Sequence, residues 1–192
     1  MILYISTIIF CMTMIVIFNI VYNIEMFSNS AWVVVAYVVF ATIIEIIIDL
    51  ILAGIVHSQK DKCFEDKKIF VVSSKERKFY EKIKIRTWKD KIIELGALGG
   101  FRKNKLSNPN DIEYVNKFIM ESYKGQIVHI FNIIFGFVIM AIPPYKWTFC
   151  VALPVALVNA ILSVLPIFVL RYNLPKLQAV KTRLTRQKTS TE

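Results

Sequence analysis

Four runs of apolar residues divide the chain, and a long polar stretch separates the second run from the third. The runs cover residues 2–24, 31–56, 127–142 and 147–170. A helix of about 20 apolar residues crosses the hydrocarbon core of a bilayer, with its backbone groups bonded internally. The pattern therefore predicts an all-α polytopic membrane protein with four transmembrane helices. No basic residues precede the first run, so we expect it to be a retained anchor rather than a cleaved signal peptide.

The polar stretch carries its own helical pattern between residues 74 and 95. Apolar or aromatic side chains recur there every three to five positions, with Lys and Glu between them: Phe79, Ile83, Trp88, Ile92 and Leu95. This spacing predicts one amphipathic helix. A basic polar face opposite a Trp favours a helix lying in the membrane interface, and the alternative is a helix facing the core of a small cytoplasmic subdomain. Three glycines then predict a loop: Gly96, Gly99 and Gly100.

Prolines mark most of the remaining boundaries. Asn108 followed by Pro109 predicts the start of the helix that leads into the third span, with Asn108 as its N-cap. Pro143–Pro144 predicts the turn between the last two spans, and Pro154 and Pro166 predict a bend in the fourth. The last dozen residues are polar, and we expect them to fray.

Composition and charge agree with this topology. The chain is 56% hydrophobic with a mean hydropathy of +0.54, which excludes an ordinary soluble domain. Residues 57–125 hold 17 Lys and Arg against ten Asp and Glu, and residues 171–192 hold six against one. The positive-inside rule then places this loop, the tail and both termini in the cytoplasm of a cell-membrane protein. Attraction to an anionic membrane surface explains these basic segments more simply than nucleic-acid binding.

The predicted organisation has four parts. Residues 1–57 and 126–172 form two-helix membrane segments, residues 58–125 form a cytoplasmic or interfacial helical segment, and residues 173–192 form a basic tail. The three cysteines imply neither a disulfide framework nor a metal site.

One histidine lies just past the expected water boundary of the third span. A titratable imidazole at that depth is costly unless it is paired, so His129 is a candidate functional residue. Gln126 is close enough along the helix to bond to its ring, and Glu121 approaches the same side two turns away. A general base needs a partner that fixes its tautomer, which makes these three residues candidate catalytic residues. The alternative is a histidine bonded to a backbone carbonyl for packing.

Two acidic residues lie within the second span. Glu45 and Asp49 are four residues apart and share one helix face, where two carboxylates repel unless a proton or a cation intervenes. They indicate a proton relay, a cation site or a general base, unless they pair with a basic residue of the loop. They also leave open a non-enzymatic function, as a small transport or flippase component. His57, at the end of this span, fits an interfacial residue.

Several motifs between Lys82 and Leu177 resemble one family. The stretches KIKIRTWKDKI, GGFRKNKL, FIMES, GQIVH and RYNLPKL occur in the order and spacing of the glycosyl-4,4'-diaponeurosporenoate acyltransferases, which are small integral-membrane proteins. The resemblance implies transfer of a fatty acyl chain to the sugar hydroxyl of a glycosylated carotenoid, with the acyl donor as co-substrate and no other cofactor. The family pattern has Glu where Gln126 stands, and usually Arg where Lys124 stands.

If the resemblance holds, His129 takes the proton of the sugar hydroxyl, and basic residues bind the donor phosphate or stabilise the oxyanion. The candidate substrate-binding residues lie in the matching motifs: Trp88, Lys89, Asp90, Lys124, Arg171 and Asn173. The expected partners are the lipid acceptor and the acyl donor.

Overall fold

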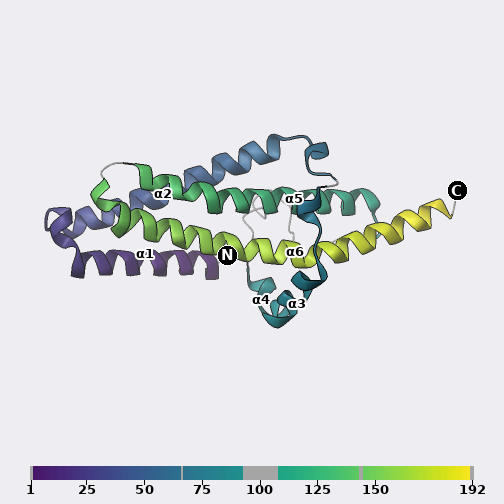
Figure 1. Cartoon of the computed structure of the whole chain (residues 1–192), viewed down its shortest axis with the longest axis horizontal. Helices are drawn as coiled ribbons and strands as arrows, with labels where there is room; N and C mark the ends of the chain where they lie inside the picture. The colour runs from purple at the N-terminus through teal and green to yellow at the C-terminus, as the bar shows by residue number, and fades with distance from the viewer. Residues whose placement is uncertain (1, 66, 93–107, 143–144, 191–192) are drawn as a thin grey trace. The chain divides into compact units, whose positions relative to one another are not determined.

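The computed structural model describes residues 2–65, 67–92, 108–142 and 145–190 (Figure 1). Its α-helices are α1 (Ile2–Tyr22), α2 (Ala31–Ser58), α3 (Ser74–Lys82), α4 (Ile85–Trp88), α5 (Ile112–Phe135) and α6 (Leu153–Thr189). Short 3-10 or π segments connect them, including η1 (Ile24–Phe27), η6 (Gly136–Ala141) and η8 (Thr148–Ala152). This part of the chain contains no strand, so the all-α prediction is confirmed. The glycine loop at Gly96, Gly99 and Gly100 and the turn at Pro143–Pro144 lie outside the described residues.

Four helical stretches are long and apolar enough to cross a membrane. They are Ile5–Tyr22, Ala31–Ser58, Ile112–Ala141 and Tyr145–Thr189. Large apolar side chains on these stretches, such as Phe10, Trp32 and Ile161, are exposed, as contact with lipid tails requires. The four predicted spans are confirmed, and the chain is a multi-pass membrane protein.

The chain divides into two compact units. Unit 1 comprises Met1–Ile55 and Val128–Val164, and unit 2 comprises Val56–Ile127 and Leu165–Glu192. The core of unit 1 is formed by apolar side chains of α1, η1, α2, η6, η8 and the first part of α6, with Trp147 buried against the ring of Tyr37. The fully buried Asn19 donates from Nδ2 to the carbonyl oxygens of Ile15 and Cys150, at 2.8 Å each. This amide ties α1 to η8.

In unit 2, helix α3 begins with a capped turn. The Oγ of Ser73 accepts a hydrogen bond from the backbone N–H of Glu76 at 3.1 Å, which starts α3. The helix ends at Lys82, and Lys84 takes a left-handed conformation with φ 50° before α4 begins. The single amphipathic helix predicted over residues 74–95 is therefore wrong. The residues buried on either side of this break are Tyr80 and Ile85, whereas Phe79, one of the predicted apolar positions, is exposed.

Helix α5 also starts later than predicted. Asp111, rather than Asn108, is the N-cap of α5, and its Oδ1 accepts from the backbone N–H groups of Glu113 and Tyr114 at 2.9 and 3.2 Å. Asn108 instead accepts from the backbone N–H of Asp111 in the preceding turn. The carboxylate fits this position because it lies among the unpaired N–H groups of the first turn.

Helix α6 runs through both units. Pro166 and Pro175 lie inside it, and each removes one backbone donor from the helix ladder. The tail does not fray as predicted, since the helix continues to Thr189. Threonine hydroxyls along this last part bond back to carbonyls one turn earlier, as at Thr182 and Thr185.

Candidate functional site

Arg171 is the centre of a polar network in unit 2. Its guanidinium binds the carboxylate of Glu76 through two nitrogens, with Nη2 donating to Oε2 at 2.9 Å. Nη1 donates to the carbonyl oxygen of Ile69 at 2.6 Å and to Oε1 of Gln126 at 3.2 Å, and Nη2 donates to the carbonyl of Val71 at 3.3 Å. One side chain of α6 thus joins α3, α5 and the segment that precedes α3.

The carboxylate of this network is fixed from its own helix. The Ser73 cap holds the first turn of α3, and Tyr80, one turn after Glu76, donates its hydroxyl to Oε1 of Glu76. The hydrogen bond from Arg171 is the main reason why the pKa of Glu76 lies below its ordinary value. Burial, and then the hydrogen bond to the Glu76 carboxylate, raise the pKa of Tyr80. Glu76 is therefore ionised and Tyr80 is a neutral donor near neutral pH.

Gln126 is held in this network on both sides of its amide. Its Nε2 donates to the backbone carbonyl of Ser122 at 3.2 Å, its Oε1 accepts from Arg171, and its side chain is only 1% exposed. These bonds point to Ser122 and Arg171 rather than to the ring of His129. The negative charge opposite Arg171 comes from Glu76, so an uncharged residue at position 126 leaves the guanidinium paired.

The next polar residues of α5 have partners near the end of α2. Glu121 lies 3.4 Å from His57, measured between Oε2 and Nε2. Lys124 is almost fully buried and pairs with Asp61 at 2.6 Å, with its ammonium over the ring of Phe64. The structure thus gives Glu121 a histidine partner, but that partner is His57 rather than His129.

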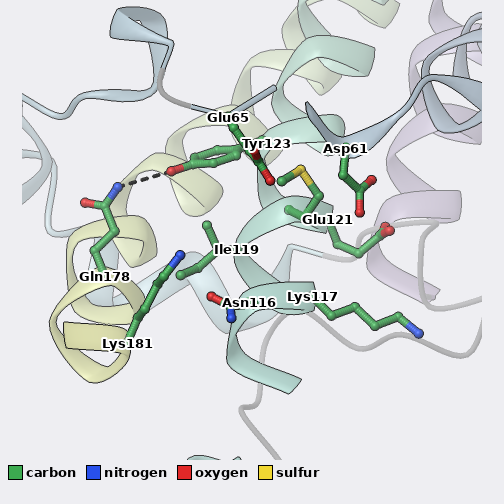
Figure 2. A pocket seen from close by; sticks show the side chains of 10 residues that line it. Asp61, Glu65, Asn116, Lys117, Ile119, Glu121, Tyr123, Gln178 and Lys181 are labelled. Carbon is green, nitrogen blue, oxygen red and sulfur yellow. Dashed lines mark hydrogen bonds between the residues drawn. The ribbon is translucent and has the colours of Figure 1, made fainter. Parts of the chain in front are cut away.

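A polar cavity of about 830 Å³ lies beside these residues in unit 2 (Figure 2). Its floor includes Tyr123, whose ring stacks on Phe70 with a centroid distance of 4.1 Å and whose hydroxyl accepts from Nε2 of Gln178 at 3.2 Å. The lining carries both charge signs and comes mainly from α5, α6 and the segment after α2: Asp61, Glu65, Asn116, Lys117, Ile119, Met120, Glu121, Tyr123, Gln178 and Lys181.

A smaller groove of about 330 Å³ brings together two stretches that lie far apart in the sequence. Arg86, just before Trp88, donates from Nε to the hydroxyl of Tyr172 at 2.7 Å. Tyr172 directly follows Arg171, and its ring packs edge-on against the ring of Tyr80. The lining residues are Tyr80, Glu81, Lys84, Ile85, Arg86, Thr87 and Tyr172.

The remaining predicted substrate-binding residues are engaged locally. The indole N–H of Trp88 donates to the carbonyl of Ile83 at 3.0 Å, and Lys89 pairs with the adjacent Asp90 at 2.7 Å. Asn173 is half-buried on α6. Among the predicted catalytic and substrate-binding residues, Gln126 of α5 and Arg171 of α6 are a pair that the structure brings together from different helices.

A second polar cluster lies in unit 1, within the membrane-spanning helices. Asn159 of α6 donates from Nδ2 to Oε2 of Glu45 at 2.9 Å and to Oδ1 of Asp49 at 3.4 Å. The two carboxylates, which we predicted to share a helix face, do meet at one amide. Gly136 makes the close approach possible, because a Cβ there would lie 3.1 Å from both Asn159 Nδ2 and Glu45 Oε2.

His129 belongs to this unit and is half-buried on α5. It lies three residues before the buried Asn132, so the two positions share one face of α5. The Nδ1 atom of the His129 ring is itself buried. The histidine therefore lies on an interior face rather than on a lipid-facing one.

Three residues of the Arg171 network and the adjoining groove were not predicted from the sequence: Glu76, Tyr80 and Tyr172. The only local signal was the Ser73-x-x-Glu76 spacing, which is typical of a helix start. Nothing in the sequence links Glu76 to Arg171, which follows 95 positions later.

Comparison with known proteins adds one finding. Residues 60–183 match the model of the glycosyl-4,4'-diaponeurosporenoate acyltransferase family. No curated protein and no solved structure matches the chain. The matched range includes the Arg171 network, the groove at Tyr172, and His129, whereas Glu45 and Asp49 lie outside it.

Proposed function

The chain belongs to the glycosyl-4,4'-diaponeurosporenoate acyltransferase family, and on this premise we propose that it transfers a fatty acyl chain to a sugar hydroxyl of a lipid-linked acceptor. The acceptor class is a glycosylated terpenoid acid or a related glycolipid. Both substrates are amphipathic, which suits an enzyme with four membrane-spanning helices.

The Arg171 network is the observation that carries this proposal. Two of its members come from stretches that resemble the family, Arg171 from RYNLPKL and Gln126 from GQIVH, and all of its residues lie within the matched range. A guanidinium held by a carboxylate, an amide and two carbonyls is rigid. It fixes the register of α5 against α6 within unit 2.

In this proposal His129 is the general base. Its imidazole takes the proton from the sugar hydroxyl while the oxygen attacks the acyl carbonyl carbon. The new C–O ester bond forms, the bond from the acyl carbon to the thiol or alcohol of the donor breaks, and the leaving group takes up the proton from the imidazolium. Glu121 binds His57 in the structure, so a carboxylate partner for His129 must come from another residue.

Substitution of the two histidines tests this assignment, because the chain contains only His57 and His129. Membranes carrying each variant are supplied with glycosyl-4,4'-diaponeurosporenoate and a long-chain acyl-coenzyme A, and the acylated product is measured by mass spectrometry. We expect His129→Ala to lower the rate by about 100-fold or more, as for loss of a general base. His57→Ala is the matched control and should stay within about threefold of the wild type.

If His57→Ala lowers the rate strongly and His129→Ala does not, the general base would be the His57–Glu121 pair. An unchanged rate in both variants would contradict histidine base catalysis altogether. Solubilised protein in each membrane sample is quantified, so that poor accumulation is distinguished from lost chemistry.

The second candidate function, transport, is favoured by one observation, namely that Asn159 joins two carboxylates inside the membrane unit. It predicts that the double variant Glu45→Gln and Asp49→Asn abolishes function while His129→Ala has little effect. Under the acyltransferase proposal the double variant retains product formation, provided that it accumulates in membranes.

A further inference from the structure

The basic residues that the sequence predicts to bind the donor phosphate already have acidic partners in the structure. Each forms an ion pair with a carboxylate: Lys89 with Asp90, Lys124 with Asp61, and Arg171 with Glu76. A phosphate at any of these positions would have to displace a carboxylate or share its cation. The charge available to an anion must therefore lie elsewhere in unit 2.

The groove at Tyr172 holds cations of a different kind. Arg86 donates from Nε to the Tyr172 hydroxyl at 2.7 Å, which holds the guanidinium at one of its three nitrogens. Lys176, one turn along α6, lies over the Tyr172 ring at 4.6 Å from the centroid and 3.5 Å from the hydroxyl oxygen. Lys84 lines the same groove from the left-handed turn between α3 and α4.

These three cations are not neutralised by close ion pairs. Within the part of the chain that the structure describes, no carboxylate lies within 4 Å of the side-chain nitrogens of Lys84, Arg86 or Lys176. Glu81 is the one acidic residue in the lining, and it acts on Arg86 only as a weak, more distant charge. The lining holds two cations against one acid, and Lys176 lies against the Tyr172 ring beside it, so the groove has a positive potential.

The cavity in Figure 2 offers a contrast in the same unit. Its lining has three carboxylates, from Asp61, Glu65 and Glu121, against the ammonium groups of Lys117 and Lys181. That balance disfavours a phosphate. The smaller groove therefore matches an anion better, although its volume is less than half that of the cavity.

We propose that the groove lined by Lys84, Arg86 and Tyr172, with Lys176 against the ring of Tyr172 beside it, binds a phosphate group of the acyl donor. The inference rests on the proposed acyl transfer, since it assigns the donor of that reaction. A guanidinium held at one nitrogen presents a planar fork to phosphate oxygens, and two mobile ammonium groups add charge. The same chemistry would also accept the phosphate of an anionic lipid head group, which the experiment separates from a soluble donor.

The test measures binding and needs no catalysis. The full chain is placed in nanodiscs of phosphatidylcholine alone, and the dissociation constants of inorganic pyrophosphate and of coenzyme A are measured by calorimetry at low salt. We expect both probes to bind, and Arg86→Gln to weaken them by about tenfold or more, as for loss of a charge-assisted bidentate contact. Arg77→Gln is the matched control, since Arg77 is an exposed arginine of α3 outside the groove and its loss changes the net charge equally.

A second arm uses nanodiscs that contain phosphatidylglycerol. If the groove serves the soluble donor, the anionic lipid weakens pyrophosphate binding to the wild type only slightly. Suppose instead that phosphatidylglycerol abolishes pyrophosphate binding to the wild type and has no such effect on Arg86→Gln. That result would assign the groove to a lipid head group and overturn the donor assignment. Equal binding by Arg86→Gln and Arg77→Gln would overturn the site itself.

The variant Tyr172→Phe tests whether the site needs Arg86 held in position as well as its charge. The variant keeps all three cations but removes the hydroxyl that holds Arg86, so a built site should lose affinity by about threefold, whereas a diffuse patch of surface charge should lose none. If the wild type forms no acylated product in the assay described above but still binds the probes, the result counts against the proposed reaction alone. If probe binding does not depend on Arg86, the result counts against the groove alone.

Discussion

Replacing Glu76 by Gln removes the charge opposite Arg171 while keeping the size and shape of the side chain. Gln can still accept one hydrogen bond from the guanidinium, but it cannot neutralise it. The Arg171 side chain is 17% exposed and that of Glu76 is 22% exposed, so neither charge is fully hydrated. The variant therefore leaves a cation in a position that was built around an anion.

The expected size follows from the burial of the pair. Breaking a fully buried pair costs roughly 3–5 kcal/mol, and exposed pairs are worth at most about 1 kcal/mol. For this partly exposed, bidentate pair we expect a loss of about 2 kcal/mol in the free energy of unfolding. In a chain of this length that corresponds to a decrease of roughly 4–8 °C in Tm.

The assay is thermal unfolding of the purified protein in detergent micelles, followed by tryptophan fluorescence. Glu81→Gln is the control, because Glu81 lies on the same helix, is exposed, and should shift Tm by about 1 °C or less. A double-mutant cycle with Arg171→Met isolates the pairwise energy, which we expect to be about 1.5 kcal/mol or more. A Glu76→Gln shift no larger than that of Glu81→Gln would refute this account of the network.

The same pair makes stability depend on pH in a defined direction. Arg171 lowers the pKa of Glu76 below its ordinary value of 4.5. The stabilisation is thus fully present above that value, and it is lost as the pH falls through the lower pKa of the folded protein. The Tm difference between wild type and Glu76→Gln should be constant from pH 8 to 6 and should shrink below about pH 4. A difference that persisted unchanged to pH 3 would contradict the charge as its cause.

Two further predictions concern the backbone. Gly136→Ala places a Cβ 3.1 Å from Asn159 and Glu45 and should lower Tm by roughly 2–4 °C. Gly54→Ala is the control, because a Cβ there meets nothing within 4 Å and should raise Tm slightly through helix propensity. Equal shifts would argue against close packing at Gly136. Lys84→Gly relieves the left-handed conformation at φ 50° and should stabilise the chain by roughly 1 kcal/mol, measured as a higher Tm in the same assay, while a decrease would mean that the lysine side chain itself stabilises the turn.

The sequence predicted the membrane helices well because their signal is local. A run of about 20 apolar residues has no other stable arrangement in a bilayer, so span positions follow from composition alone. The break at Lys84 was not predictable in the same way. Lysine is a common helix residue, and nothing in its local sequence indicates the left-handed conformation that it adopts between the buried Tyr80 and Ile85.

The candidate site was only partly predictable, because its contacts join distant residues. Gln126 and Arg171 were both recognisable as unusual polar residues at span ends, and they prove to be bonded to each other. Helix spacing puts Glu121 two turns from His129, but the histidine that lies 3.4 Å from its carboxylate is His57, near the end of α2. Helix spacing indicates which residues share a face, but it does not indicate which other helix covers that face.

The discontinuity of unit 2 has a consequence for biosynthesis. Arg171 bonds to Ile69, Val71 and Glu76 across separations of 102, 100 and 95 residues. The earlier segment emerges from the ribosome well before its cationic partner is made, so the carboxylate of Glu76 and the two carbonyls remain hydrated during that interval. Insertion of the last helix is therefore the step that completes this unit. A chain stalled before Arg171 would expose these acceptors, and quality-control proteases would find it in that state.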